Sequence, residues 1–362
     1  MKTVQGYLEI LDKGFGFLRT IENNFVAAPG DPFVPAHLIR QFNLSEGILL
    51  KGHGVKGNGK NKNLKLAQID TVNDLPLASY SKLKSLQELI SINPSEQFKI
   101  CQGPDDRIGR ALDMFVPIGK GQRGLIVSPP KSGKTTILKH IAASVQNHHP
   151  DAELYILLVD ERPEEVTDFK RALQGACVLS SSADQSIAQH MRMTRLAMNT
   201  ASRSTETGKD VVVLIDSLTR MSRAFNSQTQ SHGRTLSGGL AANALTVPRR
   251  IFGMARNIEK GGSLTVVATI LVDTGSRMDE VIFQEFKGTG NMDLVLSRAC
   301  AEQRLWPAIN INASGTRKEN LLMGKAAFQE AIAFRRKVAQ LDEITAMKAF
   351  HHYLDELGEG GS

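Results

Sequence analysis

Short apolar runs separated by amphipathic segments dominate the chain after about residue 107. The runs of strand length are Gly124–Val127, Leu154–Val159, Val211–Ile215 and Leu264–Leu271. Segments with apolar residues at helical spacing lie between them, such as Glu164–Leu173 and Ile187–Ala201. Because continuous apolar strands that alternate with helices are typical of a parallel sheet covered on both faces, the pattern predicts an α/β domain over residues 107–362.

The first 75 residues show shorter, partly alternating strand-like segments. These segments are residues 7–18, 31–34, 48–50 and 64–69, with a helical turn expected over residues 38–42. Several short strands around a Gly-Phe-Gly-Phe sequence predict a small five-stranded barrel of the OB or cold-shock type over residues 1–75. Residues 76–106 contain Pro and Ser around one amphipathic stretch, Leu83–Ile90, so we expect a linker with a helical turn there.

The loop Ser128–Thr135 stands between the first apolar run and a helical pattern over residues 136–147. A strand, a glycine-containing loop ending in Gly-Lys-Thr and a helix form the context of a phosphate-binding P-loop. Backbone N–H groups at the start of such a helix point at an anion, and the helix dipole favours negative charge there. Ser128 occupies the position where the general pattern has its first glycine, and a simple turn before a helix is the alternative.

Three residues of this loop have chemistry suited to Mg²⁺ and ATP. Gly133 lets the backbone approach the phosphates closely, and Lys134 has the length to reach the β- and γ-phosphates. The hydroxyl of Thr135 is an oxygen ligand of the kind that Mg²⁺ prefers. The sequence therefore predicts a nucleotide site here.

Charged residues directly follow the other apolar runs, at the strand ends where parallel sheets bind their ligands. Asp216 follows Val-Val-Val-Leu-Ile, the Walker-B arrangement in which an Asp holds Mg²⁺; capping of the next helix is the alternative. Glu161 ends a neighbouring strand and is a candidate to polarise the attacking water, with a surface Glu as the alternative.

Phe15 and Phe17 lie two residues apart, so in a strand both rings emerge on one face. With Gly14 and Gly16 keeping that face uncluttered, the rings form a candidate platform on which bases stack. Arg19 continues the face and is expected to meet a phosphate. The alternative is a hairpin whose Phe side chains enter the core.

A basic loop supports the nucleic-acid interpretation. It contains Lys51, Lys56, Lys60, Lys62 and Lys65 and no acidic residue among them, which suits a phosphate backbone, although a solvated hairpin tip is the alternative. The net charge of +7 is compatible with nucleic acid without requiring it.

Composition narrows the remaining classes. The chain of 362 residues is 41% hydrophobic and 22% charged, as in a globular protein of about two domains. No apolar stretch reaches the length of a membrane span, and the first residues lack an apolar core, so we expect no signal peptide. Its three cysteines form no disulfide or metal pattern, so we expect a reducing cytoplasm.

Several motifs together resemble the bacterial transcription termination factor Rho family, which are ring-shaped RNA-dependent ATPases with a RecA-like P-loop NTPase domain. The matching stretches are Gly121–Val127, Pro129–Thr135, Asp160–Val166, Asp216–Arg220, Gly238–Leu245, Phe286–Met292 and Ser314–Glu319. The resemblance runs from about residue 5 to about residue 357. P-loops of this family also lack the first Gly.

The resemblance implies ATP and Mg²⁺ as cofactors and assigns a set of nucleotide-binding residues. They are Gly119, Lys120, Gly121, Gln122, Arg123, Gly124, Lys131, Ser132, Gly133, Lys134, Thr135, Thr136, Arg162, Asp216, Arg304 and Trp306. By the same resemblance Arg317 is an arginine finger acting on a neighbouring subunit, Arg304 serves the γ-phosphate and Arg162 gates the pocket. Trp306 stacks on adenine; surface arginines and a core Trp are the alternatives.

The resemblance also implies two sites for single-stranded RNA. The first, pyrimidine-preferring site takes Gly14, Phe15, Gly16, Phe17, Arg19, Asp31 and Phe33. The second lines a central pore with two loops, Ser231–Gly239 and Thr274–Arg277, through Arg234 and Arg277. A flexible surface loop is the alternative for each of the two pore loops.

The implied function is a homohexamer that hydrolyses ATP, moves RNA 5′ to 3′ and releases it from RNA polymerase. Two departures from the family are expected: no small helical subdomain precedes the barrel, and residues 61–63 lack an aromatic that often completes the platform. The alternatives are a related ring ATPase acting on DNA or as a rotary subunit, and a non-enzymatic single-strand-binding protein.

Overall fold

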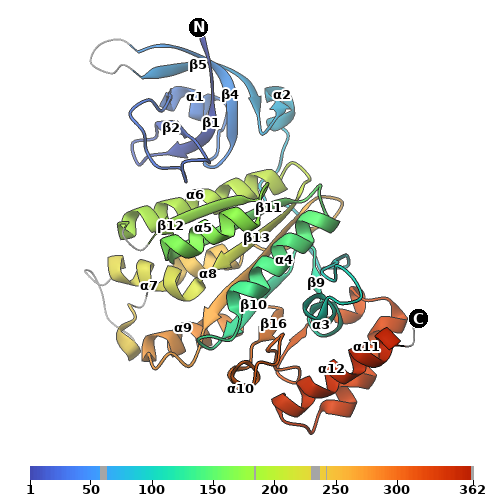
Figure 1. The fold of residues 1–362 in the computed structure, drawn as a ribbon. Coiled ribbons are helices and arrows are strands. Elements are labelled where there is room, and N and C mark those ends of the chain that lie inside the picture. Colours follow the sequence, from blue (N-terminus) through green and yellow to red (C-terminus); the bar gives the residue numbers. More distant parts are fainter. Residues whose placement is uncertain (58–62, 183–184, 230–236, 242, 360–362) are drawn as a thin grey trace.

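The computed structural model describes residues 1–57, 63–182, 185–229, 237–241 and 243–359. Figure 1 shows a β-barrel at the N-terminal end above a larger α/β domain, with the C-terminal helices at the far side of that domain. In the described part of the chain, no helix has the length and apolarity that a membrane crossing needs.

The barrel sheet has the order β3-β2-β1-β4-β5-β6, and a pairing between β3 and β5 closes it. Its elements are β1 (Lys2–Ile10), β2 (Gly16–Arg19), β3 (Phe33–Val34), α1 (Ala36–Gln41), β4 (Leu49–Lys56), β5 (Leu64–Val72) and β6 (Leu75–Pro76). Alternate side chains point inward, as strand geometry requires, and Val4, Leu8 and Leu18 are buried with Leu50 and Leu66. The predicted OB-type barrel is confirmed.

Residues 76–106 pack first against the barrel, through Leu77 and Tyr80, and then against the α/β domain. The connection holds α2 (Leu77–Tyr80), β7 (Ser91–Ile92) and β8 (Gln97–Phe98). β7 pairs with β14, and β8 pairs with β9. The helical turn predicted over residues 83–90 is a single hydrogen-bonded turn, in which Glu88 N–H donates to Ser85 C=O (2.9 Å), and not a longer helix. Tertiary contacts hold it, since Leu86 N–H donates to Glu206 (2.6 Å) and Leu86 C=O accepts from Arg256 (3.0 Å).

The α/β sheet has the order β12-β11-β13-β15-β10-β16-β17. Its strands are β10 (Arg123–Ser128), β11 (Glu153–Glu161), β12 (Cys177–Ser182), β13 (Asp210–Asp216), β15 (Ser263–Leu271), β16 (Met292–Val295) and β17 (Gly315–Thr316), with β14 (Arg256–Ile258) on β15 and β9 (Ile118–Gly119) on β8. The pairings from β12 to β16 are parallel. All four predicted apolar runs are strands of this sheet, which confirms the predicted fold class.

Helices cover both faces of the sheet (Figure 1). They are α3 (Arg107–Phe115), α4 (Lys134–His148), α5 (Pro163–Ala172), α6 (Ile187–Thr205), α7 (Leu218–Thr229), α8 (Thr246–Phe252), α9 (Arg277–Lys287), α10 (Arg298–Glu302), α11 (Lys325–Val338) and α12 (Glu343–Glu359), with short 3₁₀ turns η2 (Ser237–Gly239) and η3 (Glu319–Leu321). One hydrophobic cluster joins the sheet to α3, α4, α11 and α12, and the other joins it to α6, α7 and α9. Parallel strands carry the polar loops described below to one edge.

Candidate functional site

The P-loop lies between β10 and α4, as predicted. Lys131 (φ 64°) and Gly133 (φ 90°) adopt the left-handed backbone conformation, which Gly takes without steric cost. A Cβ at Gly133 would lie 2.7 Å from Cζ3 of Trp306, so the indole packs against the loop backbone. Ser128 needs no such freedom, because it ends a strand, and its hydroxyl contacts the Ser132 hydroxyl at 3.0 Å.

Lys134 lies between the two predicted carboxylates. Its Nζ donates to Oδ1 of Asp216 at 2.5 Å and is 3.9 Å from Oε2 of Glu161. Asp216 Oδ1 also accepts from the Thr269 hydroxyl at 2.8 Å. The strands β13 and β11 thus deliver both acids to the lysine at the carboxyl edge of the sheet.

Glu161 is almost fully buried, and its environment favours the neutral form. Burial raises the pKa of Glu161, and so does the charge of Asp216, while Lys134 and Arg220 oppose the shift. Nη2 of Arg220 is 3.2 Å from Oε1 of Glu161, and Nη1 of the same guanidinium donates to the backbone carbonyl of Asp160. A carboxyl group with a raised pKa in a buried site is suited to proton transfer near neutral pH.

The residues present fit Mg²⁺ and a nucleotide. Within the described residues, Asp216 Oδ2 and Glu161 Oε2 are buried without a hydrogen-bond partner. Because buried polar atoms are normally paired, this is the pattern of a binding site for an ion or ligand. Thr135, at the start of α4, is half-buried. These oxygens are the ligands that Mg²⁺ prefers.

The other predicted nucleotide residues on this edge have different exposures. Lys131, Thr136, Arg162 and Arg304 are exposed, whereas Ser132 is buried inside the loop and donates to Pro129 C=O at 2.8 Å. Trp306 is 40% exposed, unlike the core Trp that was the alternative. An exposed indole against the P-loop backbone is positioned to stack on a base.

One group of predicted nucleotide residues lies at the other end of β10 from the P-loop. The group is Gly119, Lys120, Gly121, Gln122, Arg123 and Gly124, at or before the amino end of the strand. Lys120 pairs with Glu96 (2.7 Å) and Asp210 (2.8 Å), and Gln122 donates to Asn291 (2.7 Å). The six residues of β10 span five steps of about 3.3 Å, roughly 16 Å, so this end lies far from the P-loop of its own protomer.

Arg317 also lies at the amino edge of the sheet. It directly follows β17, its N–H donates to Asn291 C=O at 2.9 Å, and its side chain is exposed. Burial lowers the pKa of Arg123, and the nearby charges of Arg256 and Arg317 add to the shift, so the guanidinium of Arg317 lies on the Arg123 side. An arginine on this edge cannot serve the P-loop of its own protomer.

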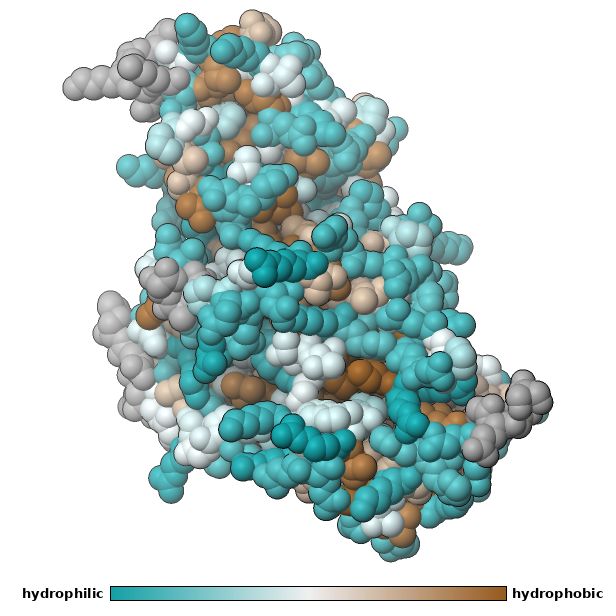
Figure 2. All heavy atoms as spheres, in the orientation of Figure 1, coloured by the Kyte–Doolittle hydropathy of each residue, from teal (hydrophilic) through white to brown (hydrophobic). Residues whose placement is uncertain are grey.

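Three aromatic rings form a connected platform on the barrel. The centroids of Phe15 and Phe17 are 6.0 Å apart, and Phe33 lies 5.4 Å from Phe15 and 5.8 Å from Phe17. All three rings are partly exposed rather than in the core. Figure 2 shows hydrophobic residues gathered over the barrel on an otherwise mostly hydrophilic face.

Arg19 and Asp31 differ from the exposed positions that a direct phosphate contact needs. Each residue is 6% exposed, and Nη1 of Arg19 donates to Asp31, while its Nε donates to Glu9 at 2.7 Å. The guanidinium lies 4.8 Å from the Phe17 ring centroid. The buried carboxylates hold Arg19 against the Phe17 ring, so we assign Arg19 and Asp31 to supporting the platform from beside it.

The two predicted pore loops lie against each other where they are described. A Cβ at Gly238 would be 3.1 Å from backbone atoms of Arg277 and Met278. Arg277 is exposed at the start of α9, whose Asp279 accepts from Arg223 at 2.8 Å. Arg234, like Lys60 and Lys62 of the basic loop, lies outside the described residues.

Sequence reasoning missed two residues that orient the carboxylates. Arg220 lies one helical turn into α7 and was quoted only as part of a motif; Thr269 lies inside an apolar strand, where only its hydroxyl is a signal. Arg220 contacts Glu161, and Thr269 contacts Asp216, across elements that are far apart in the sequence.

Two family models match the chain. Residues 4–77 match the RNA-binding domain of the Rho termination factor, and residues 109–316 match the nucleotide-binding domain of the ATP synthase alpha/beta family. A solved ATPase from a type III secretion system of pathogenic bacteria superposes with a TM-score of 0.61 at 23% identity, over 69% of this chain and 70% of that one. That likeness supports the fold alone.

Similar full-length proteins share both domains. The transcription termination factor Rho of Haemophilus influenzae is 47% identical over 95% of this chain and 82% of its own length. The Rho protein of Pseudomonas aeruginosa is 45% identical over 95% of this chain and 82% of its own. This chain belongs to the transcription termination factor Rho family.

Proposed function

We propose that this protein is an RNA-dependent ATPase that terminates transcription by pulling nascent RNA 5′ to 3′ and releasing it from RNA polymerase. The observation that carries the proposal is the presence in one chain of an aromatic platform and a P-loop bordered by two buried acids. A single-strand-binding protein does not need a P-loop with two buried acids, and a rotary ATPase does not need an aromatic platform for bases. The cytoplasm is the proposed compartment, and residues 1–75, 76–106 and 107–362 are the proposed parts.

The catalytic roles follow from the geometry. The backbone around Gly133 and the Nζ of Lys134 bind the phosphates, so Lys134 exchanges Asp216 for a phosphate oxygen. Glu161 orients the attacking water and accepts its proton, and Arg220 holds that carboxyl in place. Thr135 and Asp216 would hold Mg²⁺, which when bound neutralises charge on the phosphates. Trp306 stacks on the base.

Arg317 completes the site from a neighbouring protomer in a ring of six. Its exposed position at the amino edge of the sheet supports action in trans, because its own P-loop is at the other edge. An arginine finger contributes roughly 10³–10⁵ in rate in related phosphoryl-transfer sites.

The test is ATP turnover by the purified protein with cytosine-rich RNA, purine-rich RNA, single-stranded DNA of the same sequences, and no nucleic acid. We expect turnover to rise most with cytosine-rich RNA. Lys134→Ala should lose at least about 10²-fold, because the lysine contacts the transferred group. Lys139→Ala is the matched control, since Lys139 lies on the same helix but pairs with Asp168 outside the site. Equal stimulation by DNA, or an active Lys134→Ala protein, would overturn the proposal.

A further inference from the structure

A buried carboxylate joins the barrel to the ATPase domain. Glu9 of β1 has a side chain only 1% exposed, and two guanidinium groups from different domains share it. Arg19 Nε of the barrel lies 2.7 Å from Oε2, and Arg192 Nη2 of α6 lies 2.6 Å from the same oxygen. Arg192 Nε also donates to Oε1 of Glu9.

The barrel side of this junction lies beside the aromatic platform, on the same face of the sheet. Glu9 is the cross-strand partner of Phe17, and the Arg19 guanidinium lies 4.8 Å from the Phe17 ring centroid. A base stacked on the platform therefore lies next to a ring that already contacts the Arg19 guanidinium. If stacking moves the Phe17 ring and Arg19 with it, Oε2 of Glu9 is left to Arg192.

The ATPase side of the junction leads toward the catalytic acid. Arg192 lies in the first half of α6, which packs against α7. α7 carries Arg220, whose Nη2 is 3.2 Å from Oε1 of Glu161. A shift of α6 is therefore passed by direct packing to the helix that holds Glu161.

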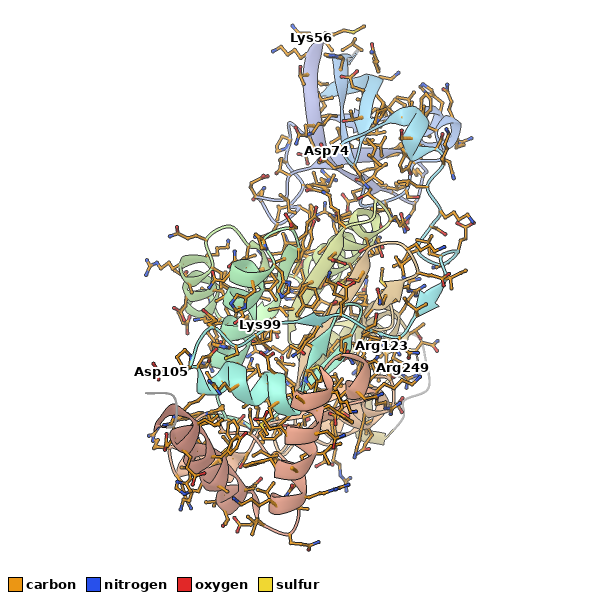
Figure 3. The ribbon with its side chains drawn as sticks, turned by 90° about the vertical axis from the view of Figure 1, so that its right-hand side faces the viewer. Lys56, Asp74, Lys99, Asp105, Arg123 and Arg249 are labelled. Carbon is orange, nitrogen blue, oxygen red and sulfur yellow. The ribbon has the colours of Figure 1, made fainter. Side chains whose placement is uncertain are left out.

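Contacts other than the Glu9–Arg192 ion pair also hold the barrel on the ATPase domain, so the domains stay attached if that ion pair rearranges. Phe25 of the barrel is fully buried in the ATPase core, and Asn24 accepts from Ser180 N–H at 2.9 Å. A cavity of about 790 Å³ lies between the domains beside Tyr7 and Tyr155. Figure 3 shows Asp74, another lining residue, at the barrel end toward the ATPase domain and Lys56 at the remote end.

We propose that Arg192 is a positioning residue that transmits RNA binding on the platform to the ATPase site, by competing with Arg19 for the carboxylate of Glu9. The proposal rests on the proposed function and adds the route by which RNA stimulates hydrolysis. It assigns Arg192 no contact with RNA or nucleotide, so its loss should separate RNA binding from stimulation.

The chain offers a close control one turn along the same helix. Arg195 of α6 also forms an ion pair across the domains, with Nε 3.3 Å from Oε2 of Glu46, but Glu46 lies before β4 and outside the platform. Arg195→Gln thus removes an interdomain pair of the same kind without touching Glu9. Arg192→Lys keeps the charge but loses the two-pronged geometry.

The experiment measures two quantities for each assembled variant: affinity for a short fluorescent cytosine-rich RNA, and RNA stimulation of ATP turnover. For Arg192→Gln we expect stimulation to fall by about fivefold to tenfold, while RNA affinity and unstimulated turnover stay within about twofold. Arg192→Lys should be intermediate. Arg195→Gln should match the wild type in every quantity.

Three results would overturn the inference: full stimulation in Arg192→Gln, an equal loss in Arg195→Gln, or a loss of RNA affinity as large as the loss of stimulation. Thermal unfolding of the Gln variants shows whether either is simply unfolded, and Arg192→Lys then decides the matter. A wild-type protein that RNA fails to stimulate would instead overturn the proposed function.

Discussion

At the scale of single residues, the ATP site depends on how one lysine and two acids share a small buried space. Lys134 neutralises Asp216 directly and lies farther from Glu161, so the two acids are not equivalent. Glu161, with burial and Asp216 raising its pKa, is the acid suited to exchange a proton. Asp216, held by Lys134 and Thr269, is the acid suited to a fixed ligand role.

Thr269→Val should reduce ATP turnover by about tenfold, because it removes a hydroxyl that holds the Asp216 carboxylate. Steady-state kinetics should place most of the change in kcat. Thr265→Val is the matched control: Thr265 is buried in the same strand and accepts from Gly121 N–H at 2.7 Å, but at the amino edge. Both variants should lose about 1 kcal/mol of stability. Equal activity in the two would show that Thr269 does not orient Asp216.

The Glu9 carboxylate makes a separate prediction about pH. Burial opposes its ionisation, yet the hydrogen bonds and charges of Arg192 and Arg19 prevail and lower the pKa of Glu9 below 4.5. A lowered pKa means that its stabilisation is complete above the unfolded pKa and is lost as pH falls through the folded pKa. At pH 7, Glu9→Gln should be about 3 kcal/mol less stable, because the buried guanidinium of Arg19 and the half-buried one of Arg192 lose a charged partner.

Urea unfolding at pH 7 and at steps below pH 4.5 tests this for wild type and Glu9→Gln. The gap between the two free energies of unfolding should narrow as the solution is acidified below pH 4.5. A gap that stays constant over that range would mean that the ionised carboxylate of Glu9 is not what stabilises the junction.

At the scale of elements, apolar pattern was a good guide to strands and a poor guide to their partners. Leu154–Val159 and Val211–Ile215 are continuous and buried on both faces, so pattern alone identifies them. β12 went unpredicted because its second half, Ser180–Ser182, is polar. The Leu83–Ile90 stretch has helical spacing but forms only a single turn, whose backbone Glu206 and Arg256 bind.

The residues of the site also divide into those that the sequence predicted and those that it did not. Lys134, Glu161 and Asp216 each follow a recognisable strand, so the sequence was enough to bring them together. Arg220 and Thr269, which hold the two acids, lie on other elements, and so do the partners of Arg19. Contacts between distant strands and helices leave no pattern in the local sequence, so the sequence did not predict them. Gly119–Gly124 remain a prediction: they are close to the P-loop in sequence but lie at the other end of β10.

At the scale of the whole molecule, each protomer of the proposed ring would carry an incomplete ATP site and the arginine that completes a neighbour's site. The P-loop and its acids lie at the carboxyl edge of the sheet, and exposed Arg317 lies at the amino edge. A head-to-tail ring brings these two edges together at every interface, whereas a two-fold dimer does not. The ring is therefore a requirement of the chemistry in this account.

Mixing two inactive variants tests that requirement most directly. Arg317→Ala keeps its P-loop, and Lys134→Ala keeps its finger, so each pure protein should hydrolyse almost no ATP in a single turnover. In rings re-formed from equal amounts of both, about a quarter of interfaces join an intact Lys134 to an intact Arg317, and single-turnover hydrolysis should recover to that extent. A mixture as inactive as its components, in rings shown to contain both proteins, would contradict the claim that ATP is hydrolysed between protomers.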